Sequence, residues 1–231
     1  LMPHSLRKII IMIIFPSISS LWGKTIYVDD NASAGGDGTS WASAHKYLQD
    51  ALAYAEYGDE IWVAEGTYKP DQGAGKTAGD RASPFVLVNG VGMYGGFLGT
   101  ENSRDPQGDN NQTILSGEID DNSSLWSLNV VSGGNLDANT NLDGFRITKG
   151  NANGASDTVY ENGGGVYLSD SNMTVSNLVV AKNSAMRSGG AILSAGSTLT
   201  LIDCVFTNNS AGDEGGGIDS SSYSSGSTIT L

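Results

Sequence analysis

Two lysines occupy equivalent positions in consecutive repeats of the chain and are the residues best suited by type to act as bases. Lys149 and Lys182 each follow a short apolar segment, 33 residues apart. Two ammonium groups close together on one edge would disfavour each other's charge, which suits a proton acceptor in general base catalysis. The alternative is that both side chains point into solvent from a turn, because Gly, Asn and Ser surround them and no carboxylate cluster shares their column. The catalytic residues stay unassigned, with Lys149 and Lys182 as the candidates.

Two acidic loops have the oxygen-rich composition that a calcium ion needs. The first loop contains Asp29, Asp30, Asn31 and Asp37, and the second contains Asp120, Asp121 and Asn122. Ca²⁺ takes roughly six to eight oxygen ligands, which such loops supply. Neither loop has the spacing of an EF-hand, and acidic loops are also common as solvated surface. The sequence therefore requires no cofactor, and Ca²⁺ is the ion that these loops favour.

The remaining polar and reactive residues have structural explanations. Arg187 aligns with Glu161 one repeat earlier and with Asp213 one repeat later, which predicts a column of ion pairs along one edge. Cys204 is the only cysteine. It has no partner for a disulfide within the chain, and we predict that it packs as a small buried side chain. Residues 163–165 do not form a phosphate cradle, because this glycine run recurs and no helix follows it.

The charge of the chain excludes one class of partner, and its first segment indicates export. The formal net charge is −13, and it becomes −15 without Arg7 and Lys8. No region supplies the basic surface that phosphate binding needs, so we expect no nucleic-acid partner. Residues 1–23 combine this basic start, a short apolar run and small residues, which predicts a secretory signal peptide. The alternative is a buried first strand.

The elements that must position these side chains are copies of one unit. The pattern at residues 163–166 recurs at 189–192 and 215–218, a spacing of 26. A unit of this size cannot bury its apolar face alone and must stack on its copies. Short apolar segments bounded by turn residues, including 125–131, read as strands. We predict an all-β fold, a right-handed parallel β-helix solenoid that forms a single domain over residues 24–231.

Equivalent positions in the repeats predict the core. The expected columns are Phe145, Leu178 and Cys204 and, next to them, Ile147, Val180 and Phe206. Like side chains stack about 4.8 Å apart along such an axis. Asn183 and Asn209 fall at strand ends, where an asparagine amide can bond to its copy in the next coil. We expect a short asparagine ladder there.

The two ends of the solenoid differ in sequence. Residues 42–57 have helical spacing of apolar side chains, which predicts an amphipathic helix that caps the N-terminal coil. Residues 227–231 (STITL) copy residues 197–201 (STLTL), so the sequence stops within a coil. We expect this chain to be a fragment of a longer protein, truncated at its C-terminus.

These segments resemble two related groups of bacterial proteins. Residues 27–68 resemble the opening of secreted right-handed parallel β-helix proteins of the pectin-lyase-like superfamily, and residues 94–101 with 113–117 resemble an element of large surface proteins of that superfamily. The Gly-Gly-Ala-Ile of residues 189–192 and the Phe-x-x-Asn of residues 206–209 resemble repeats of chlamydial-type polymorphic outer membrane proteins. Lyases, adhesins and glycan binders share this scaffold, so the resemblance specifies the fold more than the function.

The resemblance implies two functions. The first is an adhesin-like or glycan-contacting stalk, extracellular or on the outer membrane surface of a bacterium, whose partner is a polysaccharide or a host or neighbouring cell surface. Contact with a membrane is then expected only through a C-terminal anchor beyond Leu231. The alternative is a pectate or uronate lyase, which would need a basic proton acceptor and carboxylates that often hold Ca²⁺. We favour the stalk, because no cluster of acids and bases is visible in this chain.

Overall fold

Short parallel strands, stacked in four sheets, make up nearly all of the regular structure. The computed structural model describes residues 23–103, 112–119, 125–156, 158–220 and 226–231. From β2 onward, consecutive strands of the chain belong to different sheets, and each pairs in parallel with a strand one turn away. The chain is therefore a solenoid, as the repeats predict, and each sheet extends along the solenoid axis as successive coils add strands to it.

The strands are grouped here by sheet. Sheet 1 contains β1 (Thr25–Val28), β2 (Glu60–Ala64), β5 (Gly92–Phe97), β8 (Asn141–Asp143), β12 (Asn172–Ser176), β16 (Thr198–Ile202) and β20 (Thr228–Thr230). Sheet 2 contains β3 (Gly66–Tyr68), β6 (Thr113–Ser116), β9 (Arg146–Thr148), β13 (Val179–Ala181) and β17 (Val205–Thr207). Sheet 3 contains β4 (Phe85–Val86), β7 (Val131–Gly134), β11 (Val166–Ser169), β15 (Ile192–Ala195) and β19 (Ile218–Asp219). Sheet 4 contains β10 (Asn151–Ala152), β14 (Ser184–Ala185) and β18 (Ser210–Ala211).

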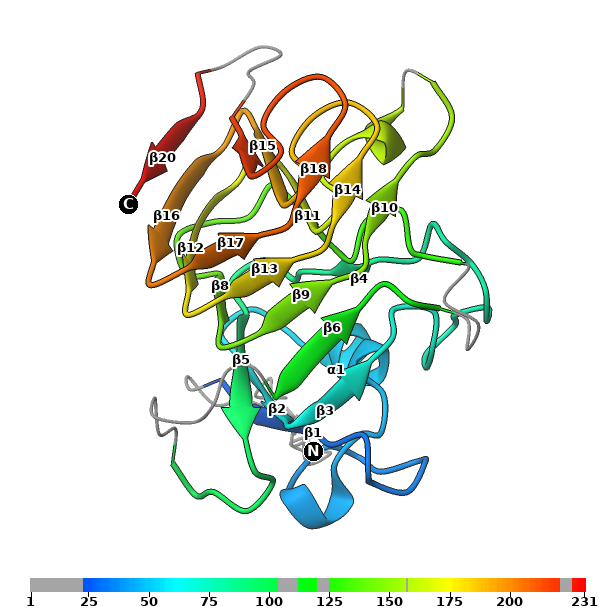
Figure 1. Cartoon of the computed structure of the whole chain (residues 1–231). Coiled ribbons are helices and arrows are strands. Elements are labelled where there is room, and N and C mark those ends of the chain that lie inside the picture. The colour runs from blue at the N-terminus through cyan, green and yellow to red at the C-terminus, as the bar shows by residue number, and fades with distance from the viewer. Residues whose placement is uncertain (1–22, 104–111, 120–124, 157, 221–225) are drawn as a thin grey trace, which may run out of the picture.

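The solenoid is right-handed. In Figure 1 the axis is vertical, with the first strands at the bottom and β20 at the top. The chain crosses the front from left to right through β9, β13 and β17, and it rises as it does so. The predicted fold class is confirmed, and its hand is the one that parallel crossover connections adopt.

The core consists of columns of like side chains. In sheet 1 the paired positions Ile26, Ile61, Met93, Leu142, Val175 and Leu201 are all buried. In sheet 2, Val180 pairs with Ile147 on one side and with Phe206 on the other. Strand side chains alternate between the two faces, so this register sends every second residue inward. Val166 pairs with Ile192, and the 26 residues between them equal the spacing of the sequence repeat.

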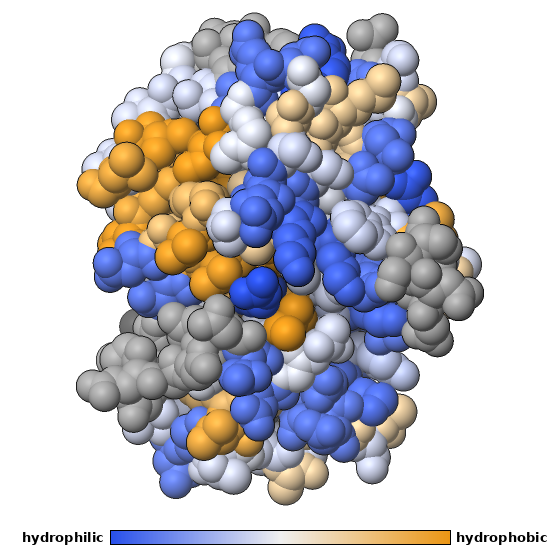
Figure 2. Space-filling view, in the orientation of Figure 1, coloured by the Kyte–Doolittle hydropathy of each residue, from blue (hydrophilic) through white to orange (hydrophobic). Residues whose placement is uncertain are grey.

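The last complete coil departs from the predicted burial. Cys204 and Phe206 pack against the core but are only half-buried. The reason is that β17 is the outermost strand of sheet 2 among the described residues, so no coil covers these side chains from above. Ile202 and Val205 are 47% and 54% exposed in the same coil. Figure 2 shows an apolar area at the upper left, over the region of β13, β16 and β17.

The asparagine ladder is confirmed. Asn183 is buried, and its Oδ1 accepts a hydrogen bond of 2.9 Å from the backbone N–H of Gly150. The Oδ1 of Asn209 accepts in the same way from the N–H of Asn183, at 3.0 Å. Two successive coils thus satisfy a turn N–H with an asparagine of the coil above, which holds the turns in register.

The N-terminal end of the solenoid is closed mainly by a loop. The helix predicted over residues 42–57 is present only as α1 (Leu48–Tyr54), with a 3-10 turn, η1, at Trp41–Ser43. His45 lies in extended backbone, because its N–H donates to Tyr27 O and its carbonyl accepts from the N–H of Asp29. These bonds pair the loop with the outer edge of β1. The α1 helix contacts β1, β2 and β4, and so lies beside the first strand of sheet 3. A second 3-10 turn, η2, spans Val159–Glu161.

Candidate functional site: the cleft around Asp30

The two candidate bases lie in adjacent turns but in different surroundings. Lys149 and Lys182 have left-handed backbone, with φ of 62° and 58°, directly after β9 and β13. The Lys182 side chain is exposed, whereas the Lys149 ammonium forms an ion pair with Glu118. The expectation that neither lysine has a matching acid is wrong for Lys149. Glu118 follows β6, one coil below β9 and outside the regular repeat, so repeat alignment did not reveal it.

The predicted calcium ligands do not form a cluster in the part of the chain that the structure describes. Within the described ranges, no three His, Cys, Asp or Glu side chains gather so as to hold a metal ion. Asp29 Oδ1 accepts a hydrogen bond from the N–H of Asn31, and Asp37 Oδ1 accepts from Thr39 and Ser43. Asp120 and Asp121 lie outside the described residues. Asp29, Asp30 and Asp37 thus serve as local hydrogen-bond acceptors.

Asp30 closes the free edge of sheet 2. Its Oδ2 accepts a hydrogen bond of 2.9 Å from the N–H of Thr67, in the outermost strand β3. The backbone N–H of Asp30 donates to the Tyr68 hydroxyl at 3.2 Å, and that hydroxyl donates to Ala64 O at 3.1 Å. Burial raises the pKa of the Tyr68 phenol far above its usual range, and the Asp30 charge raises it further. Tyr68 therefore remains a neutral hydrogen-bond donor.

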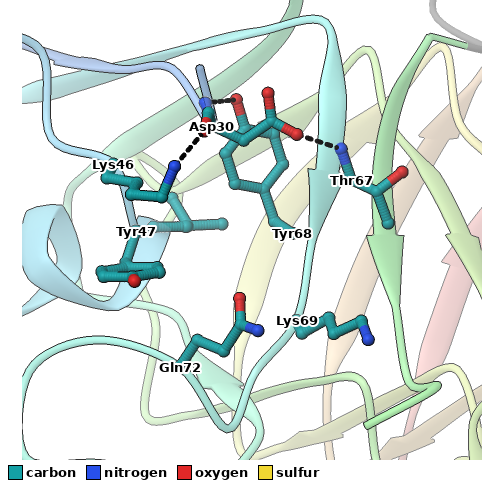
Figure 3. Close-up of a pocket in the computed structure, with 8 residues that line it drawn as sticks. Asp30, Lys46, Tyr47, Thr67, Tyr68, Lys69 and Gln72 are labelled. Atoms are coloured by element: carbon teal, nitrogen blue, oxygen red, sulfur yellow. Dashed lines mark hydrogen bonds between the residues drawn. The ribbon is translucent and has the colours of Figure 1, made fainter. Parts of the chain in front are cut away.

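Two hollows meet at Asp30 and Thr67. One has a volume of about 180 Å³ and is shown in Figure 3, with Lys46, Tyr47, Leu48, Tyr68, Lys69 and Gln72 as its other lining residues. The second has a volume of about 390 Å³ and is lined further by Asn31, Glu65, Gly66, Gln112 and Ile114. We call the two together the Asp30 cleft. It lies on the outer side of the first strands of sheet 2.

Lys46 fixes one wall of the cleft. Its Nζ donates hydrogen bonds to Asp30 O at 2.7 Å and to Ala32 O at 3.4 Å, which tie the loop to the start of α1. In Figure 3 the Gln72 amide points up into the space below Tyr68. Within the described residues, Asp30 Oδ1 accepts no hydrogen bond, so it can accept one from a ligand.

The cleft has the chemistry of a binding site for a polar ligand. Its carboxylates and amides accept and donate hydrogen bonds to hydroxyl groups, and the Tyr47 ring adds an apolar surface. The described lining contains no His or Cys. Sequence reasoning identified Asp30 as a metal ligand and missed Lys46, Lys69 and Gln72, because nothing in their spacing relates them.

Replacing Gly66 by alanine is expected to destabilise this end of the solenoid by about 1–3 kcal/mol. Gly66 has a φ of +152°, and a Cβ there would lie 2.5 Å from the Asp30 carboxylate. The added methyl group strains the backbone and displaces the side chain that closes the edge of β3. The measurement is the free energy of unfolding from urea titration. Gly217→Ala is the matched control, because no atom lies within 4 Å of the place that its added methyl group would take. Equal losses for the two variants would contradict the assigned role of Gly66.

One segment of the solenoid is similar to a repeat of a known family. Residues 203–221 match the Chlamydia polymorphic membrane protein repeat. The matched segment includes β17, β18 and β19, which are the strands that one coil contributes to sheets 2, 4 and 3. The preceding coil pairs with it in register through Val180 on Phe206 and Ser184 on Ser210. The segment similar to the polymorphic membrane protein repeat therefore lies within the part of the chain whose coils stack in register.

No curated protein matches the chain. Among solved structures, the chain is similar to the pectin methylesterase PemA from Erwinia chrysanthemi, with 12% sequence identity and a TM-score of 0.37. The similarity covers 83% of this chain and 55% of that one, so the chain spans about half of the enzyme's length. The parallel sheet topology itself identifies the fold as a β-helix.

The described helices are short. The longest, α1, has 7 residues, and no described helix has the length and apolar character needed to cross a membrane.

Proposed function

We propose that this chain is part of a secreted or cell-surface protein, extracellular or on the outer membrane surface of a bacterium, in which the β-helix is an adhesin-like stalk. The observation that carries the proposal is the match of residues 203–221 to the polymorphic membrane protein repeat, in a segment that contributes three strands to the stacked coils. A stack of such coils gives a long, rigid surface on which ligand contacts can be spread.

The partner in this proposal is a glycan or the surface of another cell. The Asp30 cleft supports it, since its carboxylates, amides and aromatic ring suit a ligand rich in hydroxyl groups. The net charge of −13 supports an exposed and well-solvated surface.

Surface display is tested on the bacterium that produces the protein. Antiserum against the purified chain should detect the protein in the culture medium or on intact cells, and protease added to intact cells should remove the cell-bound signal. A cytoplasmic enzyme measured in parallel controls for lysis. Detection only after the cells are broken would overturn the proposed location. Binding is tested separately, by applying the purified chain to an array of glycans.

We expect no uronate lyase activity from this chain. Elimination needs a base close to the proton that it removes, and Lys149 is already paired with Glu118. The purified chain is incubated with pectate and alginate in the presence of Ca²⁺, and the ultraviolet absorbance of the unsaturated product is followed. The absorbance should stay at its starting value. An increase that is abolished by Lys182→Ala would establish the lyase alternative instead.

A further inference from the structure

A second cavity lies on the other side of the N-terminal loop from the Asp30 cleft. Its volume is about 650 Å³, and it is lined by Gly35, Gly36, Asp37, His45, Asp50, Tyr54 and Ala74. A volume of several hundred Å³ is typical of sites that enclose a small organic ligand. We call it the Tyr54 cavity. It shares none of its lining residues with the Asp30 cleft.

The cavity contains an aromatic ring that is open to solvent. Tyr54 is 67% exposed, although it belongs to α1 and lies in the wall of a cavity. Its ring is parallel to that of the buried His45, with 5.9 Å between the centroids. Asp50 lies four residues before Tyr54 on α1, so the two side chains share one face of the helix. An exposed ring beside a carboxylate is a surface on which a sugar ring or a cation can pack.

Two carboxylates line the cavity, and each is held through one oxygen. Asp37 Oδ1 accepts three hydrogen bonds, from the Thr39 N–H, the Thr39 hydroxyl and the Ser43 hydroxyl. These bonds, the one from Ser43 foremost, lower the pKa of the Asp37 carboxyl to about 2. Asp50 Oδ1 accepts from the N–H of Ala74 at 2.6 Å. Among the described residues, the Oδ2 atoms of both groups accept no hydrogen bond. Both carboxylates are thus held in place before any ligand arrives.

Among the described residues that line the cavity, His45 is the one basic side chain, and its ring stacks on Tyr54. The described lining of the cavity includes neither Lys nor Arg, whereas Lys46 and Lys69 line the Asp30 cleft. The whole chain has a net charge of −13, and such a field attracts cations and repels anions. The ligand that fits two free carboxylate oxygens and a tyrosine face is therefore a cation with several N–H donors.

We propose that the Tyr54 cavity binds the ammonium group of a deacetylated amino sugar, the glucosamine unit of a polysaccharide. An ammonium has three donors for the carboxylates that line the cavity, Asp37 and Asp50, and the sugar ring packs on Tyr54. An N-acetyl group would remove the charge and two of the donors. The cavity thus selects deacetylated over acetylated chains. This inference rests on the proposed function, in that it names the kind of glycan the surface protein contacts.

The test compares oligosaccharides of equal length by calorimetric titration of the purified chain at low ionic strength. The glucosamine tetramer should bind at least about tenfold more tightly than the N-acetylglucosamine tetramer, because charge-assisted hydrogen bonds are lost on acetylation. Binding should weaken as salt is added, since the site is exposed. Equal affinity for the two tetramers would overturn the proposal.

Three variants localise the binding. Asp50→Asn keeps the Oδ1 that accepts from Ala74 and removes the charge, and Tyr54→Ala truncates an exposed side chain, so both should fold normally. Each should weaken binding of the glucosamine tetramer about five- to tenfold. Asp80→Asn is the matched control, because Asp80 also accepts hydrogen bonds within its own loop but lies outside the cavity. The affinity of the Asp80→Asn variant for the glucosamine tetramer should equal that of the wild type.

The failure of this inference can be told apart from failure of the proposed function. A chain that binds other glycans on the array but not the glucosamine tetramer overturns the ammonium site alone. A chain that binds no glycan overturns both this site and the glycan-contacting role. Retained affinity in Tyr54→Ala and Asp50→Asn, or calorimetric binding of Ca²⁺ that displaces the tetramer, would also overturn the assignment.

Discussion

Replacing Phe145 by alanine is expected to lower the free energy of unfolding by about 3–5 kcal/mol, the usual range for removing a buried aromatic ring. Phe145 is fully buried and is among the largest buried side chains of the solenoid. It lies below Leu178 in the column, since the N–H of Val179 bonds to Phe145 O, so coils above and below prevent the cavity from collapsing. Urea unfolding followed by circular dichroism gives the measurement.

Phe206→Ala is the matched control for this experiment. Its ring belongs to the neighbouring column but is only half-buried under the open edge of β17, so we expect a loss of about 1–2 kcal/mol. Equal losses at the two positions would mean that sheet 2 is covered above β17 in solution.

Asn183→Ala is expected to cost about 2–5 kcal/mol, although the side chain is small and polar. The residue is 1% exposed, its Oδ1 accepts from the N–H of Gly150, and its Nδ2 lies 3.1 Å from Ile147 O. Alanine leaves the Gly150 N–H buried without its acceptor, which costs about 1–3 kcal/mol, and also removes the hydrogen bond to Ile147 O, which contributes about 1 kcal/mol. The same urea titration measures the loss.

Ser194→Ala separates this effect from burial alone. Ser194 is fully buried, but among the described residues its hydroxyl has no hydrogen-bond partner. Its removal should therefore change the free energy of unfolding by less than about 1 kcal/mol. A loss at Ser194 as large as that at Asn183 would show that the ladder hydrogen bonds do not stabilise the fold.

The part of the fold that repeats could be predicted from sequence in detail. Val166 pairs with Ile192, and Ile192 pairs with Ile218, each 26 residues further along the chain. This pairing was predictable because an inward side chain stacks on its own copy. The first coils have no such copies. There we expected a strand at residues 125–131, whereas β7 is Val131–Gly134. A Ser-Gly-Gly sequence favours turns, and it is extended here because β4 and β11 pair with it on both sides.

The candidate sites were harder to predict than the fold, for a related reason. Asp30 and Lys149 were identified from their residue types, but their roles depend on partners that belong to other coils, Thr67 and Glu118. The segments between those residues differ in length from the repeat, so alignment of the units does not bring them together. The Tyr54 cavity combines a loop, a helix and Ala74 in the same way.

The unequal closure of the two ends gives the solenoid a direction of assembly. Gly38 and Asp30 accept hydrogen bonds from the outer edges of β1 and β3, and His45 both accepts and donates there, so the N-terminal coils are already closed at their outer edge. Each later coil adds to the exposed edge of the one before and needs nothing that follows it in the chain. Hydrogen exchange should accordingly be slowest in β2 and β5 and fastest in β17 and β18, because local unfolding and refolding of this chain take place at the coil that contains β17 and β18. A chain that emerges N-terminus first can thus fold as it emerges. Each completed coil then opposes movement of the chain back in the direction from which it came.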